Sequence, residues 1–115
     1  MEPAHKPSET EKLAAQALRA VDLIAYQDGA VVSRTLVNKS SGTVTLFAFD
    51  AGEGLSEHSA PYDAILTVTD GTAEVSLAGS PFTVRTGEMI ILPANKPHGV
   101  QARQRFKMTL TMIRE

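Results

Sequence analysis

The sequence of 115 residues contains no cysteine and no tryptophan, and aromatic residues make up only 5% of it. The absence of cysteine excludes a disulfide framework, a thiolate metal site and a cysteine nucleophile, and it is compatible with a reducing compartment. Positive charge is also scarce, because 11 lysines and arginines stand against 13 acidic residues, which gives a formal net charge of −2. A basic face is what nucleic acid binding requires, so no nucleic acid partner is expected.

Long apolar runs are absent as well. No stretch of about 18 consecutive apolar residues occurs, so no membrane-spanning segment is expected. The polar first 12 residues do not resemble a signal peptide. We therefore expect a cytoplasmic protein without a membrane partner. A chain of this length forms one domain, which buries roughly 65% of the surface that its unfolded form exposes.

The first part of the chain predicts a tail followed by a short helix. Ser8 offers a side-chain oxygen to cap a helix, and Glu11 stands three residues later, which is a capping-box signature. Apolar residues at helical spacing then predict a helix over residues 9–20. We accordingly divide the chain into residues 1–20, the tail and helix, and residues 21–115, a β domain.

Short segments rich in β-branched and aromatic residues follow, separated by turn residues. Asp70-Gly71 is the strongest turn signal, because both central positions of a type I′ hairpin turn need positive φ. Many short strands with little helix between them predict an antiparallel sandwich or barrel. The predicted strands are residues 31–37, 43–49, 65–69, 73–77, 82–85, 89–92 and 106–113.

Two histidines, His58 and His98, lie forty residues apart in β patterns interrupted by glycine and proline. The first pattern starts at Gly52, has its histidine after five residues, and reaches a second glycine at Gly71. The second pattern runs from Gly87 through Pro93 to His98. In these motifs and their order the chain resembles the cupin superfamily, and in particular its small single-domain members with a conserved barrel.

The resemblance covers residues 31–113 and implies a double-stranded β-helix, or jelly roll. It also implies a metal site, but only part of one. The second histidine of the family's His-x-His pair falls on Ala60, and the motif glutamate falls on Ala64. In the second motif, Asn95 replaces a glycine and Ala102 replaces an asparagine. His58 and His98 remain as the two candidate metal ligands, for Zn, Fe, Mn, Ni or Cu.

Strand geometry indicates which other side chains would accompany His58. Alternate residues line one face of a strand, so the inward row is expected to be Ser56, His58, Ala60, Tyr62 and Ala64. The carboxylates closest in sequence, Glu57 and Asp63, are out of phase with it. A bulge at Pro61 would be needed to turn Asp63 toward the site. Catalytic metal sites generally need three protein ligands, and only two are visible here.

Three functions stay open at this point. The first is a small-molecule-binding cupin with His58, Tyr62, His98 and Met89 in contact with the ligand, since the two alanines leave room in the interior. The second is a metal-dependent oxygenase, decarboxylase or isomerase that uses the two histidines. The third is a structural or regulatory module. The resemblance also implies a homodimer. Arg103 and Arg105 fit a solvated strand edge better than an anion clamp at the barrel mouth.

Overall fold

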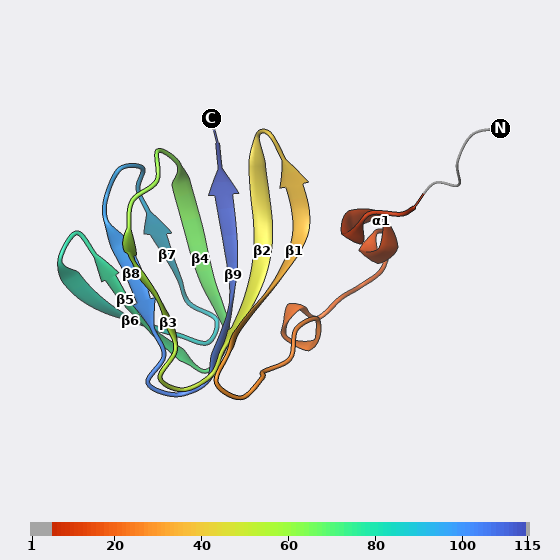
Figure 1. Cartoon of the computed structure of the whole chain (residues 1–115). Helices are drawn as coiled ribbons and strands as arrows, with labels where there is room; N and C mark the ends of the chain where they lie inside the picture. Colours follow the sequence, from red (N-terminus) through yellow and green to blue (C-terminus); the bar gives the residue numbers. More distant parts are fainter. Residues whose placement is uncertain (1–5, 115) are drawn as a thin grey trace.

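The computed structural model describes residues 6–114 and folds them into two antiparallel β-sheets that face each other (Figure 1). The strand order is β1-β2-β9-β4-β7 in the five-stranded sheet and β3-β8-β5-β6 in the four-stranded sheet. The sheets approach each other at the lower end in Figure 1 and spread apart at the upper end. The strands are β1 (Val31–Lys39), β2 (Gly42–Phe49), β3 (Gly54–His58), β4 (Asp63–Asp70), β5 (Thr72–Leu77), β6 (Ser80–Arg85), β7 (Met89–Leu92), β8 (His98–Gln101) and β9 (Phe106–Ile113).

The core lies between the sheets at their closed end. Inward-pointing residues of β2, β4 and β9 meet inward-pointing residues of β5, β6 and β8 there. Phe49 and Phe106 are completely buried, and their rings stack with centroids 4.5 Å apart. Gly71 passes so close to β9 that a Cβ atom on it would come within 2.5 Å of the Arg105 carbonyl oxygen, so only glycine fits at this point.

The predicted all-β fold with one short helix is confirmed, and the arrangement is consistent with a cupin-like double-stranded β-helix. The two sheets do not hydrogen-bond into a closed barrel. All seven predicted strands are present within a few residues of the expected bounds. The structure adds β3 and β8, which carry the two histidines. No helix in residues 6–114 is long and apolar enough to cross a membrane.

The prediction of a type I′ hairpin at Asp70-Gly71 is wrong. β4 pairs with β7 and β9, whereas β5 pairs with β6 and β8, so this turn carries the chain from one sheet to the other. Gly71 alone has positive φ there, at 74°. The two-residue hairpin turn with positive φ at both positions is instead Ala78-Gly79, at 50° and 82°, between β5 and β6. Alanine at the first of these positions gave no sequence signal for such a turn.

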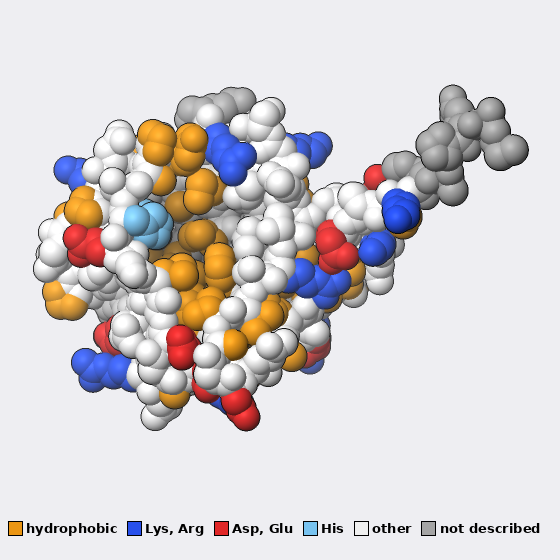
Figure 2. Space-filling view, viewed as in Figure 1, with side chains coloured by type: hydrophobic (Ala, Val, Ile, Leu, Met, Phe, Trp, Pro, Cys, Tyr) orange, Lys and Arg blue, Asp and Glu red, His pale blue; other side chains and the backbone are white. Residues whose placement is uncertain are grey.

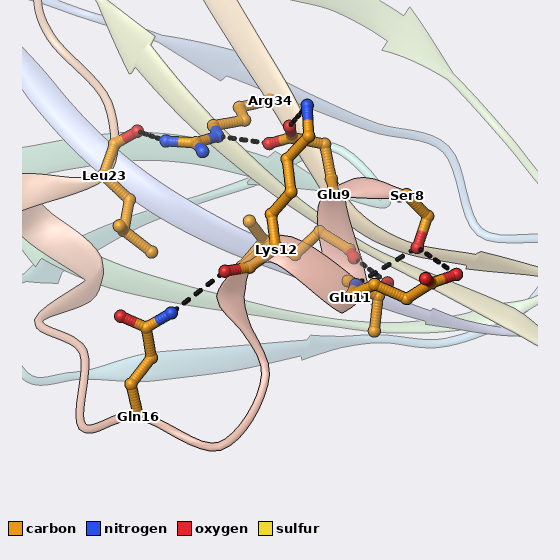
Figure 3. A network of polar contacts seen from close by, with 9 residues as sticks. Ser8, Glu9, Glu11, Lys12, Gln16, Leu23 and Arg34 are labelled. Atoms are coloured by element: carbon orange, nitrogen blue, oxygen red, sulfur yellow. Dashed lines mark hydrogen bonds and ion pairs between the residues drawn. The ribbon is translucent and has the colours of Figure 1, made fainter. Parts of the chain in front are cut away.

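The predicted helix over residues 9–20 is much shorter, since α1 spans only Glu9–Leu13. Ser8 is confirmed as the N-cap, because its hydroxyl accepts a hydrogen bond from the Glu11 backbone N–H at 3.1 Å. The helix ends at Ala14 in extended backbone and buries none of its residues, so no packing supports a second turn. Figure 3 shows what holds the segment: Arg34 of β1 donates hydrogen bonds to the Glu9 carboxylate and to the Leu23 carbonyl, both at 2.8 Å.

A network of hydrogen bonds and ion pairs at the closed end, called the clasp below, holds the segment before β1 against the sheets. Arg105 donates hydrogen bonds to the carboxylates of Asp50, at 2.7 Å, and of Asp28. The Tyr26 hydroxyl donates to Asp70 at 2.5 Å, and the Arg105 guanidinium lies 5.3 Å from the centre of the Tyr26 ring. Hydrogen bonds from Arg105 and from two backbone N–H groups lower the pKa of Asp50 to about 2. Burial, followed by the bond to Asp70, raises the pKa of Tyr26.

Candidate functional site

A cavity of about 250 Å³ lies between the two sheets, toward the end where they spread apart. Figure 2 looks into it and shows a floor of apolar side chains with a histidine at the rim. Ten of the thirteen lining residues are apolar, and the other three are a tyrosine and two histidines. The lining is Phe47, Leu55, His58, Ala60, Tyr62, Ala64, Leu66, Leu92, His98, Val100, Met108, Leu110 and Met112.

The two predicted histidines meet in this cavity. His58 at the end of β3 is paired directly with His98 at the start of β8, so strand register brings together residues forty positions apart. Their ring centroids are 4.5 Å apart, with an edge-to-face angle of 64°. His98 is buried and His58 is exposed. The site therefore has one imidazole in its wall and one at its rim.

Hydrogen bonds to backbone determine which nitrogen of each neutral ring carries the hydrogen. The Nδ1 of His58 lies 2.9 Å from the Ser56 carbonyl oxygen, and the Nδ1 of His98 lies 3.1 Å from the Lys96 carbonyl oxygen. A carbonyl oxygen only accepts, so each Nδ1 must be the donor. In the neutral ring, Nε2 is then a bare acceptor. Among residues 6–114 neither Nε2 has a hydrogen-bond partner.

A β-bulge changes the inward row that strict alternation predicts. The pairing of β3 with β8 shifts between Leu55 and His58, so one extra residue is inserted into β3. As a result Leu55 lines the cavity, whereas Ser56 lines a depression on the outer face of the same sheet. The expectation for Ser56 is wrong for this reason. His58, Ala60, Tyr62 and Ala64 do line the cavity as the alternation predicts.

Tyr62 stands half-buried in the cavity wall. The Arg114 guanidinium lies 5.9 Å from the centre of its ring, and the Arg114 backbone N–H donates to the Ser41 carbonyl at 2.8 Å. The Tyr62 hydroxyl has no hydrogen-bond partner within the described part of the chain. Tyr62 therefore presents a free O–H group, and Arg114 places a cation over its ring. Sequence reasoning missed Arg114, because it follows the last strand in a region without a motif.

The remaining predicted site residues lie elsewhere. Met89 points to the outer face of the five-stranded sheet and is 61% exposed, because Leu92 of β7 lines the cavity and Met89 has the opposite phase. Arg105 belongs to the clasp at the closed end. Arg103 lines the outer depression on the four-stranded sheet, which measures about 420 Å³ and is open and shallow. Neither arginine lines the cavity, so neither supports an anion clamp there, but the solvated-edge interpretation is wrong for Arg105, which is paired with Asp50 and Asp28.

The donor set does not complete a metal site of the usual kind. His58 and His98 supply two imidazoles, and alanines occupy the positions of the other expected ligands. Asp63 does not turn inward, because its carboxylate accepts a hydrogen bond from the Ala94 N–H at 2.8 Å. Glu57 lines the outer depression. Within residues 6–114 no group of three or more histidine, cysteine or acidic residues is placed to hold a metal ion. A catalytic site usually has three protein ligands, so these residues do not fit one.

Comparison with known proteins adds a family and several relatives. The model of the cupin domain family matches residues 45–114. A solved protein of unknown function from Streptococcus pyogenes, SPY1581, is 31% identical with a TM-score of 0.84, over 88% of this chain and 89% of that one. A cupin 2 conserved barrel domain protein from Leptotrichia buccalis is 41% identical with a TM-score of 0.79, over 81% of this chain and 45% of that one.

One curated relative also matches. Protein SchB from Streptomyces halstedii is 33% identical over 70 residues, which is 60% of this chain and 51% of the relative. The matched region thus spans about half the length of that protein. The recognised relatives share the β domain, and their names specify no ligand or reaction.

Proposed function

The chain belongs to the cupin family, and from that starting point we propose that it binds a small, largely apolar molecule in the cavity between its sheets. The observation that carries the proposal is the cavity's composition. Apolar side chains form most of its wall, and three polar groups, on His58, Tyr62 and His98, reach into it. Ligand pockets in proteins combine a mostly hydrophobic lining with a few placed polar groups in this way.

The two alanines favour a small molecule over a metal ion as the occupant of the cavity. Ala60 and Ala64 replace longer side chains that would otherwise extend toward the two imidazoles. Their small size leaves apolar volume beside His58 and His98. Transfer of apolar ligand surface into such a volume is favourable by about 25 cal/mol per Å². A metal-dependent reaction would need ligands beyond the two imidazoles, and no observation in the described residues favours it. The proposal includes the cytoplasmic location expected from composition, which fractionation of cells would test.

Fluorescence titration tests the proposal directly. The chain has no tryptophan and only two tyrosines, so the emission of naphthalene compounds can be followed with little interference from the protein. We expect 2-naphthol or 2-fluoronaphthalene to bind wild-type protein at one saturable site. We also expect Ala60→Trp to weaken that binding at least about tenfold, because the indole would fill space at the rim; a tenfold change corresponds to about 1.4 kcal/mol.

A matched substitution separates blocked binding from a general effect of added bulk. Ala17 is exposed in the segment after α1 and does not line the cavity, so Ala17→Trp should leave binding unchanged. Binding that survives Ala60→Trp would place the compound outside the cavity. That result, or the absence of saturable binding of either compound to wild-type protein, would overturn the proposal.

A further inference from the structure

We infer that the ligand is a neutral compound with an acidic hydroxyl group, a phenol or an enol, which donates a hydrogen bond to the Nε2 atom of His58 or of His98. This inference rests on the proposed function, because it names the chemical class of molecule that the same cavity takes. It comes from the hydrogen-bonding groups that line the cavity, because acceptors without a partner predominate among them.

The cavity contains two acceptors that have no partner in residues 6–114, one on buried His98 and one on exposed His58. Both Nδ1 atoms donate to backbone carbonyls, so each neutral ring presents a bare Nε2. The two rings are 4.5 Å apart, so both acceptors belong to one small region of the cavity. Because the surrounding wall is apolar, a ligand that fills this region expels the water that would otherwise pair with Nε2. A ligand that leaves a buried acceptor unpaired therefore binds more weakly than one that donates to it.

The same lining groups disfavour an anionic ligand. None of the residues that line the cavity in the described structure carries a fixed positive charge. Arg114 lies 5.9 Å from the centre of the Tyr62 ring and is not among the residues that line the cavity. A carboxylate would also bring an oxygen lone pair toward Nε2 lone pairs, which offer it no proton. Moving a carboxylate from water into such surroundings is costly unless it is paired, so a hydroxyl group suits the cavity better.

Tyr62 adds a donor to the cavity lining. Its hydroxyl has no partner among residues 6–114, and a phenol can both donate and accept. A ligand that also carries a carbonyl oxygen, as an enolised dicarbonyl does, could accept from Tyr62 while its hydroxyl donates to an imidazole. The combination of two bare acceptors and one phenolic donor therefore matches a hydroxylated, unsaturated carbon skeleton.

Three naphthalene compounds test the inference at pH 8, above the range in which histidine ordinarily titrates. They are 2-naphthol, the near-isosteric 2-fluoronaphthalene, which lacks the donor, and the anionic 2-naphthoate. We expect 2-naphthol to bind at least about tenfold more tightly than either of the others, as one well-formed hydrogen bond to a buried acceptor allows. A merely apolar cavity would give the reverse order for the two neutral compounds, because the hydroxyl would lose its water without compensation.

Substitutions at the two histidines identify the acceptor. His58→Phe and His98→Phe keep an aromatic ring but remove Nε2, and the one that removes the acceptor should reduce the preference for 2-naphthol several-fold with little effect on 2-fluoronaphthalene; no reduction in either variant would overturn the inference. His98→Gln retains an acceptor oxygen and should keep part of the preference. His58 is exposed, so its variant remains informative if the substitutions at buried His98 impair folding.

The outcomes distinguish the two proposals. Equal binding of 2-naphthol and 2-fluoronaphthalene, both lost in Ala60→Trp, would overturn the inference and leave the binding function standing. Tightest binding of 2-naphthoate would also overturn the inference, since it would require a cationic site. Saturable binding of none of the three compounds would overturn the binding function and the inference together.

Discussion

Restoring one missing ligand should convert the cavity into a metal site. Ala60 lines the cavity together with both histidines, at the position where the family pattern has its second histidine. Ala60→His would add a third imidazole at the same mouth. Three histidines form one of the donor sets of catalytic zinc sites. Because Ala60 is only half-buried, the larger side chain can be accommodated at the rim without displacing core residues.

The size of the effect follows from linkage between binding and folding. A metal ion that binds only the folded state stabilises it by about 2.7 kcal/mol when its free concentration is 100 times the dissociation constant. In a domain of 115 residues, 1 kcal/mol raises Tm by about 4 °C, so the Ala60→His variant should gain about 10 °C. Wild-type protein, which offers two imidazoles, should gain much less at the same zinc concentration.

Thermal unfolding with and without zinc, together with elemental analysis after dialysis, measures this gain. Ser56→His is the matched control. Simple alternation places residue 56 on the same side as His58, but the bulge between Leu55 and His58 turns it to the outer face. We expect about one zinc per chain in Ala60→His, because the three imidazoles form one site, and none retained in Ser56→His. A folded Ala60→His variant that binds no more zinc than Ser56→His would refute the geometry described for the cavity mouth.

Three further predictions concern stability and assembly. Phe106→Ala should lower the free energy of unfolding by about 3–5 kcal/mol in urea titrations, since the ring is completely buried, and a loss below about 1 kcal/mol would contradict the assigned core. Asp50→Asn should lower Tm at pH 7, and the gap to wild type should close as pH falls toward 2. The pKa of Asp50 is depressed to about 2 by its bond to Arg105, so its stabilising effect is present above the ordinary carboxyl pKa and is lost on acidification; a constant gap would argue against that role. The expected homodimer stays a prediction, and the exposed outer residues Met89 and Ile91 suggest the surface to test. If light scattering finds a dimer, Ile91→Lys should dissociate it, and a wild-type monomer at micromolar concentration would contradict the prediction.

The long strands could be predicted from sequence because two features both indicate a strand there: apolar and polar residues alternate, and the side chains are of types that favour β structure. In β9, apolar residues from Phe106 to Met112 alternate with polar ones, and the structure buries the apolar set. β3 and β8 were not among the predicted strands. They are only five and four residues long, and each contains glycine and polar residues, so neither shows an alternating apolar pattern. Their extended backbone depends on pairing with each other across forty residues. The β propensity of each short segment does not reveal such long-range pairing.

The candidate site could be predicted only in part, because some of its features depend on spacing in the sequence and others on the three-dimensional backbone. Motif spacing identified His58, Tyr62 and His98, and all three line the cavity. Ser56 was assigned to the wrong face because β3 contains a bulge. The residue types in β3 do not indicate this bulge from sequence. Met89 was misplaced because a four-residue strand gives too short a pattern to fix its phase. The tautomer of each histidine depends on a neighbouring backbone carbonyl, so it becomes visible only once the backbone is placed.

The position of the site along the sheets explains how its chemistry can change while the fold is retained. Burial along β9 decreases from Phe106 and Met108, which are 0% and 1% exposed, to half-buried Leu110 and Met112 at the mouth. The residues that stabilise the fold most therefore lie at the closed end, whereas the histidines lie where packing is loosest. Replacing a ligand at the mouth with alanine removes a few contacts and leaves the stacked aromatic core intact. Substitutions at the mouth should consequently alter ligand preference at a small cost in stability, and substitutions at the closed end should do the opposite.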